Sequence, residues 1–312
     1  LKTAQEMSAF AYRSRDVHLM LARDAKIEHR FRHTGWMKLY RSQAGLDGSR
    51  DDRELMQHYG VGFDLLGAAE LKEIEPHLKP IYAGAVLITS ASNVVSPGGV
   101  TEAYAGLFQA EGGEVLSRTV QRIDRNTDGF RITTEQGDIE VGQVVVAAGP
   151  WSADLLKPLG YNLPMAYERG YHQHFQTKDG ATLSRACNDI EGGFSISPME
   201  RGIRVTSGIQ LADRDAPADY SQIRSVFPVV EQAISLGAPV ENQPWKGSRP
   251  SMPDTKPVIG QAARHKGLWM AFGHGHIGFG TGPFTGQLLA QMVAGKPTEI
   301  DVDAFSPARF GA

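Results

Sequence analysis

The sequence predicts an α/β fold in which a doubly wound parallel sheet is interleaved with a domain built on an antiparallel sheet. Two unbroken apolar runs carry this prediction, at residues 143–149 and 268–272, because a strand buried on both faces has no polar side. Each run passes through a glycine-containing loop into an expected helix, as in parallel α/β units. Strands of alternating polarity lie between the two runs, so both domains are expected to be discontinuous in sequence.

The composition is that of an ordinary globular protein with a substantial core. The chain has 312 residues, of which 41% are hydrophobic and 21% charged, and its formal net charge is −3. Lys and Arg form no basic run, so nothing favours a nucleic-acid partner. No apolar run approaches the ~20 residues of a membrane-spanning helix. The single cysteine, Cys187, excludes an internal disulfide and is expected to be a small buried side chain, and a cytoplasmic location fits both observations.

In the first third of the chain, helices alternate with short extended segments. Apolar positions at helical spacing and at alternating spacing distinguish the two kinds of element. The glycine pair Gly112-Gly113 ends the last of these helices. The expected elements are a helix at 3–24, a strand at 35–40, helices at 51–59 and 67–74, an extended segment and turn at 83–96, and a helix at 99–111.

Short strands follow at regular spacing, and the Asp128-Gly129 pair among them is a strong hairpin signal. Longer strands of alternating polarity are expected from 165 to 211. The last helix is expected to begin at Pro283 and to end before Gly295. The remaining expected elements are strands at 114–118, 119–125, 129–135 and 138–141, helices at 151–157 and 219–236, and a strand through 245–250.

The densest chemical signal is the segment Gly273-His-Gly-His-Ile-Gly-Phe-Gly-Thr-Gly-Pro283, which joins an expected strand to an expected helix. Glycine lets backbone N–H groups approach a flat ligand closely, and the N-terminus of a helix favours negative charge. The alternative is a tight turn that binds nothing. These residues alone therefore indicate a ligand site without identifying the ligand.

Arg249 is the second candidate, since Pro250 holds it in an extended conformation and its planar guanidinium suits bidentate capture of a carboxylate. A purely structural arginine is the alternative. Two His-x-His pairs, His172 with His174 and His274 with His276, raise the question of a metal site. No Cys or carboxylate stands at a spacing that would complete such a site, so no metal is predicted and these histidines are expected to pack or to form hydrogen bonds.

Several motifs in the same order along the chain carry a family resemblance. They are Val145-Val-Ala-Ala-Gly-Pro-Trp151, Glu168-Arg-Gly-Tyr-His172, Trp245-Lys-Gly-Ser-Arg-Pro-Ser-Met-Pro-Asp254, Leu268-Trp-Met-Ala-Phe-Gly-His-Gly-His-Ile-Gly278 and Ala308-Arg-Phe310. Together they resemble the D-amino acid oxidase and glycine oxidase superfamily of FAD-dependent oxidoreductases, and the nearest match is to bacterial D-amino acid dehydrogenases of the small-subunit type. The fold that the resemblance implies is an incomplete doubly wound FAD-binding domain interleaved with an antiparallel-sheet substrate domain.

The resemblance implies FAD as the cofactor and a role for each matching position. Arg249 would hold the substrate carboxylate, and the backbone around His276 would receive the amino group. Tyr171 and Phe194 would be walls of the substrate pocket, whereas Glu168 and Asp254 are expected to be structural. The expected FAD contacts are Gly275, His276, Ile277, Gly278, Phe279 and Gly280 at the isoalloxazine ring, Val120 at the adenine, and Ala148, Gly149 and Trp151 along the diphosphate and ribitol.

The reaction that the resemblance implies is the oxidative deamination of a D-amino acid. The α-hydrogen would leave as a hydride to flavin N5 without a side-chain base, and the imino acid would hydrolyse to a 2-oxo acid and ammonia. Oxygen, a quinone or a partner protein would accept the electrons. A secondary-amine oxidase of the glycine or sarcosine type is one alternative. A catalytically incompetent chain that serves as a scaffold subunit is the other.

The start of the sequence departs from the family pattern. Members begin with a strand, a Gly-x-Gly-x-x-Gly turn and a helix that bind the FAD pyrophosphate, and on the order of 80–100 residues of that pattern are unmatched here. We therefore expect a second polypeptide to supply this segment, or a truncated chain, and we expect peripheral attachment to the inner face of the membrane as an alternative location. The expected domains are 1–29, 92–160 and 251–312 for FAD, and 30–91 and 161–250 for substrate.

Overall fold

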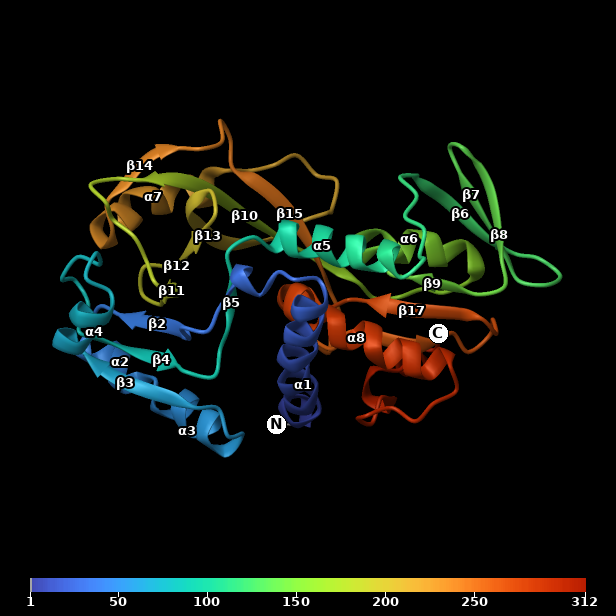
Figure 1. Cartoon of the computed structure of the whole chain (residues 1–312), viewed down its shortest axis with the longest axis horizontal. Coiled ribbons are helices and arrows are strands. Elements are labelled where there is room, and N and C mark those ends of the chain that lie inside the picture. The colour runs from blue at the N-terminus through green and yellow to red at the C-terminus, as the bar shows by residue number, and fades with distance from the viewer. Residues whose placement is uncertain (1) are drawn as a thin grey trace.

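The computed structural model describes residues 2–312 and places them in two connected parts (Figure 1). One part is a wide nine-stranded sheet, and the other contains a three-stranded sheet that carries helices on both faces. Helices α1 (Lys2–Asp24) and α5 (Pro97–Ala110) lie near the middle of the molecule, between the two parts. Both helices agree with the predicted ranges to within two residues.

The nine-stranded sheet runs in the order β14-β10-β13-β12-β11-β2-β4-β3, and β15 pairs with the other part of β10. All neighbours are antiparallel except β11 and β2, which are parallel and bring distant segments of the chain together. The strands are β2 (Trp36–Tyr40), β3 (Phe63–Gly67), β4 (Gly84–Ile88), β10 (Ala166–Thr177), β11 (Ala186–Asp189), β12 (Phe194–Met199), β13 (Gly202–Leu211), β14 (Leu236–Pro239) and β15 (Trp245–Ser251).

The two faces of this sheet differ because successive side chains of a strand point to opposite sides. One face is apolar and is covered by α4 (Ala68–Ile74) and α7 (Ser221–Ala233), with Tyr171, Phe194 and Cys187 in its core. The opposite face carries the charged and polar side chains of the same strands, among them those of Glu168, His172, Arg204 and Arg249. The polar face is therefore where chemistry is to be sought.

The smaller sheet confirms the two predicted parallel strands. Strand β9 (Val144–Val146) is parallel to β17 (Leu268–Phe272), and β16 (Val258–Gln261) adds an antiparallel edge. Helices α1 and α8 (Gly278–Val293) cover one face through Phe10, Trp269 and Phe284. The other face packs against α6 (Ser152–Leu156) and a meander of β6 (Val120–Arg125), β7 (Phe130–Thr134) and β8 (Gly137–Val141), with Met270 and Phe130 in that core.

The remaining elements are short. Residues 31–32 (β1) pair with residues 93–94 (β5), and α2 (Gln43–Gly48) precedes α3 (Arg50–His58). Residues 113–119, where a strand was predicted at 114–118, form no strand, because the three-stranded meander begins only at β6 and no neighbour pairs with them within residues 2–312. No helix in that range is long and apolar enough to cross a membrane.

Helix α8 begins five residues earlier than predicted, at Gly278, and Pro283 lies inside it. Proline has no N–H group, so the Phe279 carbonyl, four residues earlier, lacks its usual intrahelical donor. The His18 side chain from α1 replaces that donor, with Nε2 2.8 Å from the Phe279 oxygen. The glycine-rich segment is therefore helical from Gly278 onward, because another helix compensates for the proline.

Asp189 joins the middle of the large sheet to its covering helix. Its buried carboxylate accepts hydrogen bonds from Arg41 Nε at 2.9 Å and from the Tyr82 hydroxyl at 2.8 Å. Burial raises the pKa of Tyr82 well above its usual range, and the Asp189 charge adds to the effect. Arg41, which follows β2, also donates to Gln232 on α7 at 3.1 Å. Through Arg41, the Asp189 carboxylate at the end of β11 is therefore connected to the end of β2 and to α7.

We expect Asp189→Ala to lower the free energy of unfolding by about 3 kcal/mol, since it leaves the partner of a buried ion pair uncompensated. The control is Glu140→Ala, which removes the exposed Arg131–Glu140 pair and should cost less than about 1 kcal/mol. Urea unfolding followed by circular dichroism measures both variants. Equal losses in the two would show that Asp189 does not have this role.

Candidate active site

The candidate site is centred on the pairing of β10 with β15. In this antiparallel register Glu168 lies opposite Arg249, Gly170 opposite Gly247 and His172 opposite Trp245, so all six share the polar face. The guanidinium of Arg249 lies over Gly170, where a Cβ atom would overlap it. The absence of a side chain at Gly170 therefore lets Arg249 lie along the sheet.

A second contact joins this pair to the glycine-rich segment. His276 lies in a short 3-10 helix, Gly275–Ile277, and its Nε2 forms a hydrogen bond with a carboxylate oxygen of Glu168. Burial raises the pKa of Glu168, but the His276 hydrogen bond and the Arg249 charge outweigh it and lower the pKa below its usual value. Glu168 therefore remains a carboxylate that faces Arg249 and binds His276. Its expected structural role did not include this link, which depends on a register that the sequence does not specify.

Arg249 lines a cavity of about 410 Å³, which we call the arginine cavity. A second guanidinium, that of Arg204 on β13, lines the same space, and Trp245 and Phe279 form part of its wall. His172 stacks on Trp245 with ring centroids 4.8 Å apart. The other lining residues are Asn93, Val94, Pro97, Ala186, Ser197, Pro198 and Met199.

A larger cavity of about 930 Å³ lies between α1 and the start of α8, and we call it the α8 cavity. His276, Ile277, Phe279 and Gly280 form one wall, and α1 forms another through residues that include His18. Phe279 lines both cavities, so the two adjoin. Among residues 2–312, no side chain caps the first turn of α8, which leaves backbone N–H groups at this wall.

His18 fixes the geometry of that wall. Its Nε2 donates to the Phe279 carbonyl at 2.8 Å, and its Nδ1 lies 3.0 Å from the Tyr104 hydroxyl on α5. Burial lowers the pKa of His18, although the hydrogen bond to Phe279 opposes the shift. The neutral ring therefore joins three helices at the side of the α8 cavity. The sequence offered no pattern that pointed to His18.

The predicted positions after β9 also lie at this end of the small sheet. Strands β9 and β17 are parallel, so their carboxyl ends lie at the same edge of the sheet. Residues 148–151 follow β9 at this edge, and the glycine-rich segment follows β17. Ligands of such sheets bind at the carboxyl ends of the strands. Gly149 has φ +53°, a conformation that favours glycine, and the turn it begins contacts β15. Trp151 and Val120 are exposed, and the Arg214 guanidinium lies 5.5 Å from the Trp151 ring.

Tyr171 and Phe194 lie away from both cavities. Strand alternation turns them to the helix-covered face, where they are 1% and 2% exposed. The Tyr171 hydroxyl donates to Gln210 at 2.6 Å and accepts from Arg169 at 2.9 Å. These contacts place both side chains in the core of the large sheet.

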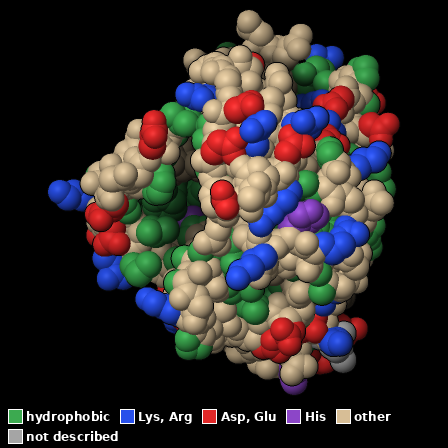
Figure 2. Space-filling view, turned by 90° about the vertical axis from the view of Figure 1, so that its right-hand side faces the viewer, with side chains coloured by type: hydrophobic (Ala, Val, Ile, Leu, Met, Phe, Trp, Pro, Cys, Tyr) green, Lys and Arg blue, Asp and Glu red, His purple; other side chains and the backbone are tan. Residues whose placement is uncertain are grey.

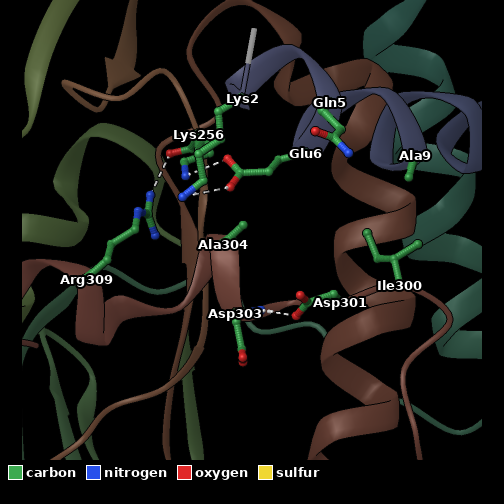
Figure 3. Close-up of a pocket in the computed structure, with 10 residues that line it drawn as sticks. All are labelled: Lys2, Gln5, Glu6, Ala9, Lys256, Ile300, Asp301, Asp303, Ala304 and Arg309. Atoms are coloured by element: carbon green, nitrogen blue, oxygen red, sulfur yellow. Dashed lines mark hydrogen bonds and ion pairs between the residues drawn. The ribbon is translucent and has the colours of Figure 1, made fainter. Parts of the chain in front are cut away.

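A third cavity, of about 700 Å³, lies at the beginning of α1 beside the C-terminal segment (Figure 3). Two ion pairs lie at this cavity: Lys256 lies 2.9 Å from Glu6, and Arg309 lies 2.8 Å from Asp254. Arg309 also donates to the backbone carbonyls of Lys256 and Pro257. These contacts bind α1 to the end of the chain.

The two histidine pairs make contacts with other protein groups. Within residues 2–312, no three His, Cys, Asp or Glu side chains are arranged to hold a metal ion. His274 Nε2 lies 2.8 Å from Thr285 Oγ1, and His174 Nδ1 lies 2.8 Å from Glu241.

Cys187 is fully buried, and burial raises the pKa of its thiol. On the face seen in Figure 2, acidic and basic side chains are mixed, and a hollow at one edge is lined by hydrophobic groups.

Comparison with known proteins identifies the family. Residues 1–292 match the DAO family, described as FAD dependent oxidoreductase. The chain belongs to this family. A D-amino-acid oxidase of Bradyrhizobium diazoefficiens is 30% identical over 319 aligned residues, which cover 98% of this chain and 74% of the relative. A D-amino acid dehydrogenase of the same organism is 32% identical, covering 97% of this chain and 73% of that protein.

Solved structures of such enzymes share the fold. Glycine oxidase from Geobacillus kaustophilus superposes with a TM-score of 0.86 at 22% identity, covering 97% of this chain and 83% of that one. L-proline dehydrogenase from P. horikoshii gives 0.81 at 20% identity, covering 96% and 82%. At these identities the likeness concerns the fold alone, and it confirms the predicted fold class.

The residues present at the α8 cavity fit the ring system of FAD. The cavity is wide enough for a flat aromatic group, and one wall is the uncapped start of a helix whose N–H groups favour an anionic ring edge. A Cβ added at Gly280 would meet nothing within 4 Å, so the backbone there is open to close approach. A flavin in this cavity would adjoin the arginine cavity at Phe279.

We expect acid to destabilise the protein partly through His172. Burial, with the Arg204 charge adding to it, lowers the pKa of His172 from 6.5 to about 4. Between these two pH values the unfolded chain binds a proton that the folded chain does not. The contribution of His172 to the free energy of unfolding is therefore fully present above pH 6.5, and it is lost as the pH falls towards 4. The variant His172→Gln should reduce that slope by about 1.4 kcal/mol per pH unit. Identical slopes in urea unfolding would contradict this.

Proposed function

We propose that this protein oxidises the carbon–nitrogen bond of a D-amino acid, with FAD as the electron acceptor at the α8 cavity. The observation that carries the proposal is the position of Arg249, which lines one cavity while the start of α8 lines the adjoining one. The two relatives of about 30% identity, a D-amino-acid oxidase and a D-amino acid dehydrogenase, support the substrate class. Bound FAD would take the α-hydrogen as a hydride at N5.

The chain's own residues would bind and orient the substrate. Arg249 would hold the α-carboxylate by paired hydrogen bonds, and the backbone around His276 would receive the amino group. Glu168 would position both, because its carboxylate binds the His276 ring and faces Arg249. The imino acid formed would hydrolyse to a 2-oxo acid and ammonia, and no protein side chain is assigned as a base.

The separate hydrophobic cores support the proposed division into domains. One core lies wholly within the large sheet and its helices, which belong to segments 30–91 and 161–250. Two others join the small sheet to α1, α6 and α8, from segments 1–29, 92–160 and 251–312, and one of them also includes Tyr161 at the start of segment 161–250. In this division Val120, Ala148, Gly149 and Trp151 would contact the adenine, diphosphate and ribitol of FAD.

The acceptor that reoxidises the reduced flavin would be oxygen, a quinone or a partner protein. A second polypeptide that completes the FAD site, and peripheral attachment to the inner face of the membrane from the cytoplasmic side, belong to the same proposal.

An absorption spectrum tests the proposal directly. Protein mixed with FAD and freed of excess cofactor should show the flavin bands, and an anaerobic panel of D-amino acids should bleach them. L-Amino acids of the same side chains are the matched control and should leave the bands unchanged. Bleaching by sarcosine or glycine but by no D-amino acid with a side chain would replace the proposal with the secondary-amine oxidase. A colourless protein that takes up no FAD would favour a scaffold role.

We expect Arg249→Ala to weaken the apparent affinity for D-amino acids by at least about 30-fold, since it removes the cation that binds the carboxylate. Arg249→Lys should recover part of this loss, because a point charge replaces the fork. The control is Arg131→Ala, which changes an exposed arginine of the meander. Steady-state kinetics measures all three, and an unchanged KM in Arg249→Ala would refute the assignment.

The companion variant Gly170→Ala tests whether the position of the guanidinium matters. A Cβ at residue 170 would overlap the Arg249 side chain, so we expect kcat/KM to fall about 10–100-fold while the free energy of unfolding changes little. Gly106→Ala is the matched control, because its Cβ would meet nothing within 4 Å. If both variants retain full activity, Arg249 does not need this placement.

A further inference from the structure

The arginine cavity contains more positive charge than one carboxylate requires. Arg204 and Arg249 both line it, and none of the residues lining it is an Asp or a Glu. Nε of Arg204 and Nη1 of Arg249 are buried, and each lacks a hydrogen-bond partner within residues 2–312. A buried charged donor without a partner is costly and is rare in native proteins, so a ligand that pairs with it is one explanation.

Other partly or fully buried arginines in this protein have partners. Arg41 binds Asp189 at 2.9 Å, and Arg185 binds Glu75 at 3.0 Å. Arg169, which is completely buried, donates to the Tyr171 hydroxyl at 2.9 Å and to the Pro217 carbonyl at 2.6 Å. Nε of Arg169 is also buried without a partner, but its terminal nitrogens are bound, whereas Arg204 and Arg249 form no hydrogen bond or ion pair with a side chain among residues 2–312.

The charged groups near Arg204 do not neutralise it. Glu241 is already bound by Arg201 at 3.0 Å and by His174 at 2.8 Å. His172 lies on the neighbouring strand, and burial lowers its pKa to about 4. Its ring is therefore neutral near pH 7 and cannot offset the charge of Arg204. Glu168, the carboxylate opposite Arg249, forms its hydrogen bond with His276. The cavity thus carries two cations, of which only Arg249 has a carboxylate opposite it.

The positions of the two arginines on the sheet fit two separate anionic groups. Arg249 is on β15, whereas Arg204 is on β13, on the far side of β10. In the register Arg204 lies opposite His174 and Ser197, and Arg249 lies opposite Glu168, so they approach the cavity from different directions. Met199 and Trp245 provide an apolar wall in the same cavity, against which a short carbon chain can pack.

We propose that Arg204 is a specificity-determining residue that binds a second carboxylate, so that the substrate is a dicarboxylic amine. This inference rests on the proposed function, in which Arg249 binds the first carboxylate. The second carboxylate comes either from the side chain of an acidic D-amino acid or from a second carboxymethyl group on the amine nitrogen. Both present two anions joined by a short carbon chain.

Kinetics with isosteric substrates tests the inference. The FAD-loaded protein is reduced anaerobically with D-aspartate and D-glutamate, with their amides D-asparagine and D-glutamine, and with iminodiacetate. We expect the acidic substrates to exceed their amides in kcat/KM by at least about 30-fold, because the amide leaves Arg204 without a charged partner. Reduction by iminodiacetate but not by D-aspartate would identify the nitrogen substituent as the source of the second carboxylate. A wild-type preference for the amides would overturn the inference.

Variants of Arg204 separate specificity from folding. Arg204→Met should abolish the preference in kcat/KM for acidic substrates over their amides, and Arg204→Lys should restore part of the preference. The control Arg224→Met removes an exposed arginine from α7, on the other face of the sheet, and should leave the preference unchanged. An equal loss towards acidic and amide substrates in Arg204→Met would also overturn the inference.

A binding measurement distinguishes failure of this inference from failure of the proposed function. Calorimetry with succinate and with propionate needs no turnover. We expect succinate to bind the wild type at least about tenfold more tightly than propionate, and Arg204→Met to remove the difference. If no amine reduces the flavin but this pattern holds, the proposed function fails and the dicarboxylate site stands. If succinate binds no better than propionate, the dicarboxylate site fails, whatever the activity.

Discussion

The register of β10 against β15 determines what the rest of the site can be. Side chains alternate along a strand, so a shift of one residue would move Arg249 from the polar face to the helix-covered face, on which Tyr171 lies. The register that forms instead puts Glu168, Arg249 and Gly170 together and leaves the apolar side chains of β10 in the core. The large core under α4 and α7 therefore stabilises the fold and, through this alternation, also selects the residues that face a ligand.

A second constraint holds the wall of the α8 cavity within the part of the molecule that is built on the small sheet. Pro283 removes a donor from the start of α8, and His18 supplies it from α1 to the carbonyl of Phe279, a residue that lines both cavities. The wall of the cavity is thus held by a contact across nearly the whole length of the chain. Because the His18 ring is neutral and partly buried, its replacement by a charged side chain would disturb this wall and the packing of α1 together.

Local sequence patterns predicted most helices and strands, but they did not predict contacts between residues that are far apart in the sequence. The helix at 3–24, the strands at 144–146 and 268–272 and the meander follow from periodicity and from turn residues such as Asp128-Gly129. The parallel pairing of β2 with β11 has no local signal, and the early start of α8 depends on His18, far away in sequence. In the same way, the sequence identified Arg249 from its neighbours but could not place Glu168 or Arg204 beside it.

The position of Cys187 offers a direct view of how the large sheet opens. It is the only cysteine of the chain, it is completely buried, and it lies in β11 where that strand pairs with β2. A thiol reagent can react with it only when the sheet opens locally, because the thiol is inaccessible in the closed state. The labelling rate of this one atom therefore measures the opening of the large sheet separately from that of the part built on the small sheet. Ligands that bind on the polar face would slow this rate, although they never touch the sulfur.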